Sequence, residues 1–310
     1  MNVCQPRLSK QVVALAAIAL LSACGGGGGG DDGAATDTTT SAETAQSVSA
    51  NGMVVSQDAA HATSETLKTT QAVVAGAQAS QTYACAGGGT AVYTVSGSSG
   101  TALTNGALDT GETYSLTFAA CRGSAGAASL DGAMTFAVTA ASTDSATVQT
   151  STQGIVVALP NRTLTLNGSS TLAQTVTMNG ASIVTTNRWT SSQILLTSVR
   201  NARSSSLTLS GIDFTRSVST TGGGTGNGTL TIAASLPNGA WTATIATQGT
   251  VSYDTSGLPM QGSWQITLPH NRIGLQLAAG SATITVDHGP DGTIDRTWTY
   301  TVDSLAAQAA

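Results

Sequence analysis

Hydrophobic and polar residues alternate along most of the chain beyond residue 81. In Tyr114-Ser115-Leu116-Thr117-Phe118, every second side chain is apolar and the side chains between them carry hydroxyls. Successive side chains of a β-strand point to opposite faces of a sheet, so this period of two predicts half-buried strands. Further apolar sets with the same period are Met134, Phe136 and Val138; Leu164, Leu166, Leu172, Val176 and Met178; Trp241, Ala243, Ile245, Val251 and Tyr253; and Ile294, Trp298, Tyr300 and Val302.

Short turn signals separate these alternating runs. Asn179-Gly180, Pro237-Asn238-Gly239 and Pro290-Asp291-Gly292 contain the residue types that favour tight hairpin turns. We therefore predict an all-β domain over residues 81–305, formed by a single antiparallel multi-strand meander. Because one face of such a sheet is apolar and must be buried, we expect a curved sheet, a sandwich or a partly closed barrel.

Four glycines, Gly132, Gly168, Gly211 and Gly262, each lead into an alternating run. Their spacing is too irregular for a solenoid, which keeps a tight period. Glycine inside a strand often marks a bulge or a bend. We therefore expect these positions to curve the sheet.

The first 80 residues lack the period of two. Residues 24–55 are rich in Gly, Ser and Thr and begin with a run of six glycines at 25–30, which predicts a flexible tether. Residues 56–80 are Ala-rich and predict a short helix with a thin apolar stripe. Residues 306–310 are interpreted as a tail.

The N-terminus has the pattern of an export signal. Arg7 and Lys10 precede an apolar core at residues 12–21, which is followed by Leu21-Ser22-Ala23-Cys24. This segment resembles the lipobox of bacterial lipoproteins, in which the cysteine is acylated and becomes the new N-terminus. The resemblance implies a signal peptide at 1–23, lipidation of Cys24 and a membrane anchor. Gly25 stands where an aspartate would imply retention in the inner membrane of enteric bacteria, so we expect the outer membrane, facing either the periplasm or the cell surface.

Two cysteines remain in the body of the chain, Cys85 and Cys121. Export to an oxidising compartment favours a disulfide between them, and two buried free thiols are the alternative. A metal-binding pair is disfavoured because no histidine lies near either cysteine in the sequence.

The segment around these cysteines resembles a loose group of exported β-rich proteobacterial proteins without a known activity. The resemblance rests on Tyr83-Ala84-Cys85-Ala86-Gly87-Gly88-Gly89, on the segment 111–121 that ends in Ala119-Ala120-Cys121, and on Leu130-Asp131-Gly132. It covers residues 81–140 and implies a Cys85–Cys121 pairing and an antiparallel sheet.

Composition and charge exclude one class of partner. Only 9% of the residues are charged, and the net charge is −5. The few arginines are scattered, whereas nucleic-acid binding needs clustered basic residues. We therefore expect no nucleic-acid partner.

The densest polar cluster is Asp287-His288-Gly289-Pro290-Asp291-Gly292-Thr293-Ile294-Asp295. Asp287, Asp291 and Asp295 have part of the spacing of a calcium loop, in which several carboxylates converge on one hard cation. Gly289 and Trp298 occupy two positions where such a loop needs ligands. The segment therefore predicts a hairpin turn, with a weak calcium site as the alternative and no other cofactor.

Catalytic signatures are weak. The three histidines, His61, His270 and His288, do not have zinc-ligand spacing, and no Gly-x-Ser-x-Gly elbow is present. Three of the four tryptophans fall among the apolar residues of the alternating pattern in their strands, namely Trp241, Trp264 and Trp298. This position favours core packing over a ligand groove. We predict that the protein is not an enzyme.

These observations lead to a functional hypothesis: a non-enzymatic, lipid-anchored cell-envelope protein with a structural or binding role. The alternative is a periplasmic carrier that holds an apolar ligand on a curved sheet. A membrane-spanning β-barrel and a serine hydrolase rank below both. An aromatic content of 4% is too low for the two aromatic girdles of such a barrel.

Overall fold

The computed structural model describes residues 40–77, 81–97, 104–160, 162–200, 203–236, 239–255 and 257–310. The chain divides into two units, residues 1–37 and 38–310, and the fold below is that of the second unit. The predicted signal peptide, Cys24 and residues 24–39 of the predicted tether lie outside the described residues. So do Pro237 and Asn238 of one predicted turn.

The described residues form two helices and fifteen strands. In chain order they are α1 (Ala42–Gly76), β1 (Thr82–Ala84), β2 (Thr90–Ser96), β3 (Thr113–Cys121), β4 (Ser129–Ala141), β5 (Ser145–Leu159), β6 (Arg162–Asn179), β7 (Ser182–Arg200), β8 (Arg203–Ser219), β9 (Gly224–Leu236), β10 (Gly239–Thr247), β11 (Val251–Tyr253), β12 (Pro259–Thr267), β13 (Asn271–Ala278), β14 (Ser281–His288), β15 (Arg296–Thr301) and α2 (Val302–Ala306).

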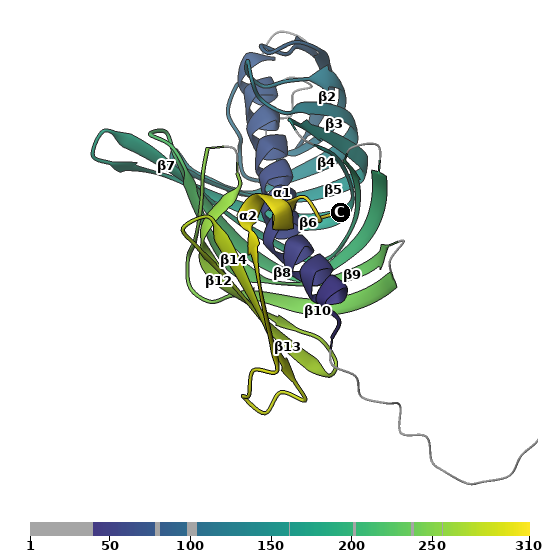
Figure 1. The fold of residues 1–310 in the computed structure, drawn as a ribbon. Helices are drawn as coiled ribbons and strands as arrows, with labels where there is room; N and C mark the ends of the chain where they lie inside the picture. The colour runs from purple at the N-terminus through teal and green to yellow at the C-terminus, as the bar shows by residue number, and fades with distance from the viewer. Residues whose placement is uncertain are drawn as a thin grey trace, which may run out of the picture. The chain divides into compact units, whose positions relative to one another are not determined.

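All fifteen strands belong to one antiparallel sheet. Each strand pairs with its neighbours in the sequence, except that the short β11 pairs with β9 and β12 while β10 pairs directly with β12. The predicted all-β meander is therefore confirmed. The sheet curves around α1, which contacts strands from β5 to β14 (Figure 1).

The predicted helix exists, but its predicted boundaries were wrong. α1 begins at Ala42, so residues 42–55 are helical rather than part of a tether, and it ends at Gly76 rather than at residue 80. The Oγ of Ser41 caps its start by accepting a hydrogen bond from the Thr44 N–H at 3.2 Å. Among the described residues, no helix combines the length and apolarity needed to cross a bilayer.

The extra helical turns were missed because α1 is buried on nearly all sides and shows no single apolar stripe. Ala45, Val48 and Met53 are fully buried, and small residues lie between them. A Cβ at Gly52 would lie 3.2 Å from Cδ1 of Ile245 on β10, so the helix backbone approaches the sheet closely there. Several hydroxyl groups remain compatible with this burial because they bond to backbone carbonyls of the helix. For example, the Ser64 Oγ donates to the Ala60 carbonyl at 2.9 Å.

Glycine positions coincide with bulges that bend the sheet, as predicted for three of the four. The strand register shifts between Asp131 and Ala133, between Gly168 and Thr171, and between Ser210 and Asp213. A further shift at a glycine, Gly154, lies between Gln153 and Ile155 and was not predicted. These shifts lie in neighbouring strands, so they bend the same part of the sheet.

The alternation of apolar and polar residues predicted which side chains form the core, with two exceptions. Tyr114, Phe136 and Leu164 are buried in the core, whereas Met178 and Ile294 are 74% and 53% exposed. Met178 lies at the end of β6, beside the Asn179-Gly180 turn of a hairpin that projects from the sheet (Figure 1). Ile294 was predicted to belong to the last strand, but it lies in the loop before β15, which begins at Arg296.

The C-terminal residues are not a free tail, which corrects the interpretation of 306–310. The Ala310 N–H donates to the Asn51 Oδ1 of α1 at 3.0 Å. Ser198 and Arg200 of β7 donate to the carbonyls of Ala310 and Ala306 at 3.1 and 2.7 Å. The segment after β15 therefore connects α1 to the middle of the sheet.

The disulfide between Cys85 and Cys121 is present, with a Cα–Cα distance of 5.5 Å. It joins the loop after β1 to the end of β3. This bond fastens the first strands of the meander together.

Candidate functional site

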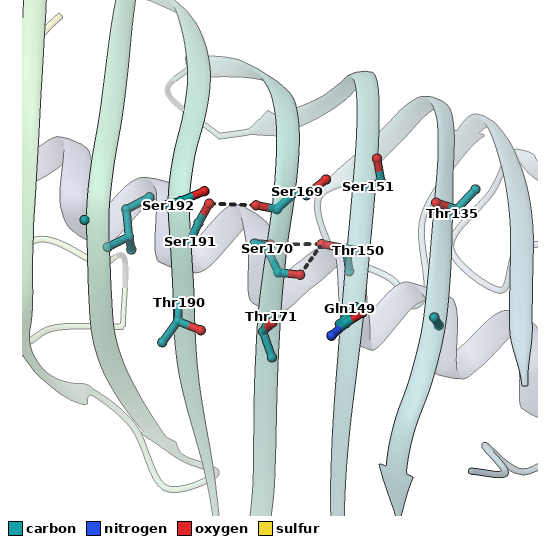
Figure 2. Close-up of a pocket in the computed structure, with 13 residues that line it drawn as sticks. Thr135, Gln149, Thr150, Ser151, Ser169, Ser170, Thr171, Thr190, Ser191 and Ser192 are labelled. Carbon is teal, nitrogen blue, oxygen red and sulfur yellow. Dashed lines mark hydrogen bonds between the residues drawn. The ribbon is translucent and has the colours of Figure 1, made fainter. Parts of the chain in front are cut away.

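A groove of about 580 Å³ crosses five neighbouring strands, β4 to β8, on the face of the sheet opposite α1 (Figure 2). Nine of its thirteen lining residues are serines or threonines. The lining consists of Thr135, Ala137, Gln149, Thr150, Ser151, Ser169, Ser170, Thr171, Thr190, Ser191, Ser192, Gly211 and Ile212.

Strand register places the groove's polar side chains in rows that cross the strands. Thr135 pairs with Ser151, and Ser151 pairs with Ser169. A second row begins at Gln149, which pairs with Thr171, and Thr171 pairs with Thr190. Because paired residues in neighbouring strands point to the same face, each row presents its side chains along one line.

The hollow itself lies where strands bulge. Between the pairs Gly168–Ile194 and Thr171–Thr190, two residues of β6 face three of β7. Gly168 has φ +137°, and a Cβ there would lie 2.9 Å from the Gln193 carbonyl oxygen, so a larger residue would be strained. The Ser191 Oγ donates to the Ser169 carbonyl at 2.6 Å and fixes the bulged strand (Figure 2).

The lining of the groove contains no charged side chain. Arg188 and Asp213 lie beside the groove, and Asp213 pairs in register with Thr190 of its lining. Arg188 donates two hydrogen bonds to the Asp213 carboxylate, at 2.8 and 2.7 Å. These bonds lower the pKa of Asp213 and neutralise both charges at the margin of the groove.

On the opposite, apolar face of the sheet, the space between α1 and the strands behind the groove is small. The hollow between α1 and strands β4 to β7 measures about 20 Å³ and is lined by Leu67 and Trp189 among others. Such a volume admits about one water molecule. Trp264 is fully buried, and Trp241 and Trp298 pack against the same core, as the alternation in their strands predicted. Trp189, whose position was not predicted, is fully buried too.

One ion pair lies inside the fold between α1 and β6. The Arg162 Nη1 lies 2.6 Å from the Asp58 Oδ2, and the two side chains are 7% and 18% exposed. Burial raises the pKa of Asp58 to about 6, and the charges of Arg162, Arg200 and Arg216 oppose this rise in part. Burial likewise lowers the pKa of the Arg162 guanidinium.

A second charged group lies on the partly exposed side of α1. The Glu65 Oε1 lies 3.9 Å from the His61 Nε2 and 3.7 Å from the Lys68 Nζ. Burial and the nearby charge of Arg216 lower the pKa of His61. These distances describe weak pairs along one helix.

The predicted calcium residues cap a turn instead of forming a cation site. Asp287 is buried, and its two carboxylate oxygens accept hydrogen bonds from the N–H groups of Asp291 and Gly292, each at 3.1 Å. The Asp295 Oδ2 accepts from the His288 N–H at 2.7 Å. In the part of the chain that the structure describes, no group of three or more His, Cys, Asp or Glu side chains is placed to hold a metal ion. The hairpin-turn prediction therefore replaces the calcium alternative.

Comparisons with known proteins assign no family to this chain. No family model matches it, and no curated protein or solved structure does so either.

Sequence analysis identified the hydroxyl-rich face but missed the groove. The period of two placed Thr171 and its neighbours opposite the core. The hollow depends on several bulges lying side by side in different strands, and pairing partners so distant in sequence are not evident from the periodicity. The signal that was available was Gly168 and Gly211 within alternating runs.

Proposed function

We infer that the protein is a non-enzymatic lipoprotein of the cell envelope, anchored at the outer membrane through acylation of Cys24. Its sheet serves a structural or binding role through the outer face. One observation carries this proposal: α1 occupies the space against the apolar face, which leaves the hydroxyl-rich outer face as the broad surface available to a partner.

The position of the chain's entry into the fold supports this arrangement. The Thr40 N–H donates to the Asn271 Oδ1 at 3.2 Å, so the chain enters the domain beside the start of β13. In the order of the sheet, β13 is separated from β8 by several strands. The point of attachment to the leader and the groove therefore occupy different parts of the sheet.

The alternative proposal, a carrier of an apolar ligand, needs space on the apolar face. That face is covered by α1, and the hollow beneath the helix measures about 20 Å³. A bound acyl chain would have to displace the helix and its buried side chains, such as Leu67.

Substitution of Cys24 tests the anchor. We expect Cys24→Ala to abolish incorporation of a palmitate analogue and to move the protein from the membrane fraction to the soluble fraction. Cys4→Ala is the matched control, because it removes the other cysteine of the leader and leaves the lipobox intact. Equal labelling of both variants, or an unlabelled wild-type protein, would refute the anchor.

A further inference from the structure

We propose that the groove on the outer face binds an uncharged oligosaccharide laid across strands β4 to β8. This inference rests on the proposed binding role of the outer face and names the class of ligand. It follows from what the groove offers to a ligand and from what it lacks.

The lining excludes ligands that need charge or a large apolar surface. It contains no Lys, Arg, Asp or Glu, and the adjacent Arg188 is already bonded to Asp213. Its apolar surface is small in total and is supplied by Ala137, Ile212 and the methyl groups of the threonines, with no Leu, Val or aromatic side chain. An anion would lack a counter-charge, and an acyl chain would lack a hydrophobic wall.

The strands of the groove also exclude a peptide that binds by strand addition. Strand addition requires an edge with free backbone N–H and C=O groups. Each of the strands β4 to β8 is paired on both sides, so none of them offers a free edge. Recognition therefore rests mainly on side chains.

Two of the nine hydroxyl side chains, those of Thr150 and Ser170, also line the hollow beneath α1 and bond to each other. The other seven and the amide of Gln149 can both donate and accept hydrogen bonds. An oligosaccharide presents the same chemistry at regular intervals. Neighbouring strands lie about 4.8 Å apart, which is close to the length of one sugar unit in an extended chain. The row of Gln149, Thr171 and Thr190 therefore places a polar side chain at each step of a ligand that crosses the strands.

Many of these groups are available to a ligand. Gln149, Ser151 and Ser192 are exposed. No aromatic residue lines the groove, so stacking against a sugar ring does not contribute to binding. We expect weak binding, with a Kd of roughly 0.1 to 1 mM.

Calorimetric titration of the full-length protein tests the proposal. The probes are linear hexamers of glucose, mannose and N-acetylglucosamine, with hexagalacturonate as the charged comparison. The protein is kept in an amine-oxide detergent, because detergents with sugar head groups would compete for the groove. We expect at least one uncharged hexamer to bind and hexagalacturonate not to bind.

Two variants locate the binding. The triple substitution Gln149→Ala, Thr171→Ala and Thr190→Ala should weaken binding by about tenfold or more, because several hydrogen bonds are lost together. The single substitution Ser151→Trp should block the groove if the triple variant does not fold. The matched control is the triple substitution Ser115→Ala, Thr117→Ala and Thr299→Ala, which removes exposed hydroxyls from β3 and β15 outside the groove.

The proposal is overturned if none of the uncharged hexamers binds at about 10 mM, or if the groove and control variants lose affinity equally. Either result leaves the membrane anchor unaffected, because that is measured separately through Cys24. Conversely, hexamer binding by a protein that is not acylated would support the groove and refute the anchor.

Discussion

Asp58 illustrates at the scale of one residue how burial makes stability depend on pH. Burial raises its pKa from 3.8 to about 6, against the opposing charge of Arg162. The folded protein therefore holds this proton more tightly than the unfolded chain does. The resulting stabilisation is fully present below pH 3.8 and is lost as the pH rises through about 6. The loss amounts to about 3 kcal/mol by linkage.

We predict that Asp58→Asn removes this pH dependence. Between pH of about 4 and about 7.5, the free energy of unfolding of the wild-type protein should fall by about 2–3 kcal/mol relative to the variant. His61 contributes with the opposite sign because its pKa is lowered, but it is present in both proteins and drops out of the difference. Denaturant titrations at several pH values measure this. Parallel pH profiles for the two proteins would contradict the prediction, and Asp144→Asn provides an exposed control.

At the scale of elements, the disulfide fastens strands that otherwise end the sheet. β1 has three residues and pairs only with β2 among the described strands. Cys85 and Cys121 are separated by 36 residues in the sequence. A loop of this length corresponds to about 4 kcal/mol of stabilisation in the chain-entropy model.

We therefore expect the double substitution Cys85→Ala and Cys121→Ala to lower the free energy of unfolding by about 3–4 kcal/mol. Adding a reductant should lower the melting temperature of the wild-type protein and leave that of the double variant unchanged. A wild-type melting temperature that is insensitive to reductant, with the thiols shown to be reduced, would count against this role of the bond.

The elements differ in how far the sequence predicts them. Strands such as β3 follow directly from the period of two, because one face is buried and the other is solvated. The first part of α1 could not be predicted in this way. Ala45, Ala50 and Asn51 are all buried although they lie on different sides of the helix, so no stripe with helical period marks an apolar face. The small residues that led to the prediction of a flexible tether are the ones that allow the helix to pack closely against the sheet.

At the scale of the whole domain, the curvature of the sheet and the position of α1 together bury the apolar face of the sheet. A single sheet with one apolar face cannot remain exposed, and the sequence left open whether a second sheet or curvature would bury it. In the structure the sheet curves around α1, and residues 302–310 connect that helix to β7 (Figure 1). The groove and the occupied interior are consequences of the same curvature.

Hydrogen exchange of the full-length protein most directly tests the central claim that α1 fills the apolar face. We expect the backbone amides between Ala45 and Val74 to exchange as slowly as those of the central strands β6 and β7, because helix and sheet bury each other. Fast exchange throughout α1, while β6 and β7 stay protected, would contradict the account. That result would show an apolar face open to a ligand and would favour the carrier.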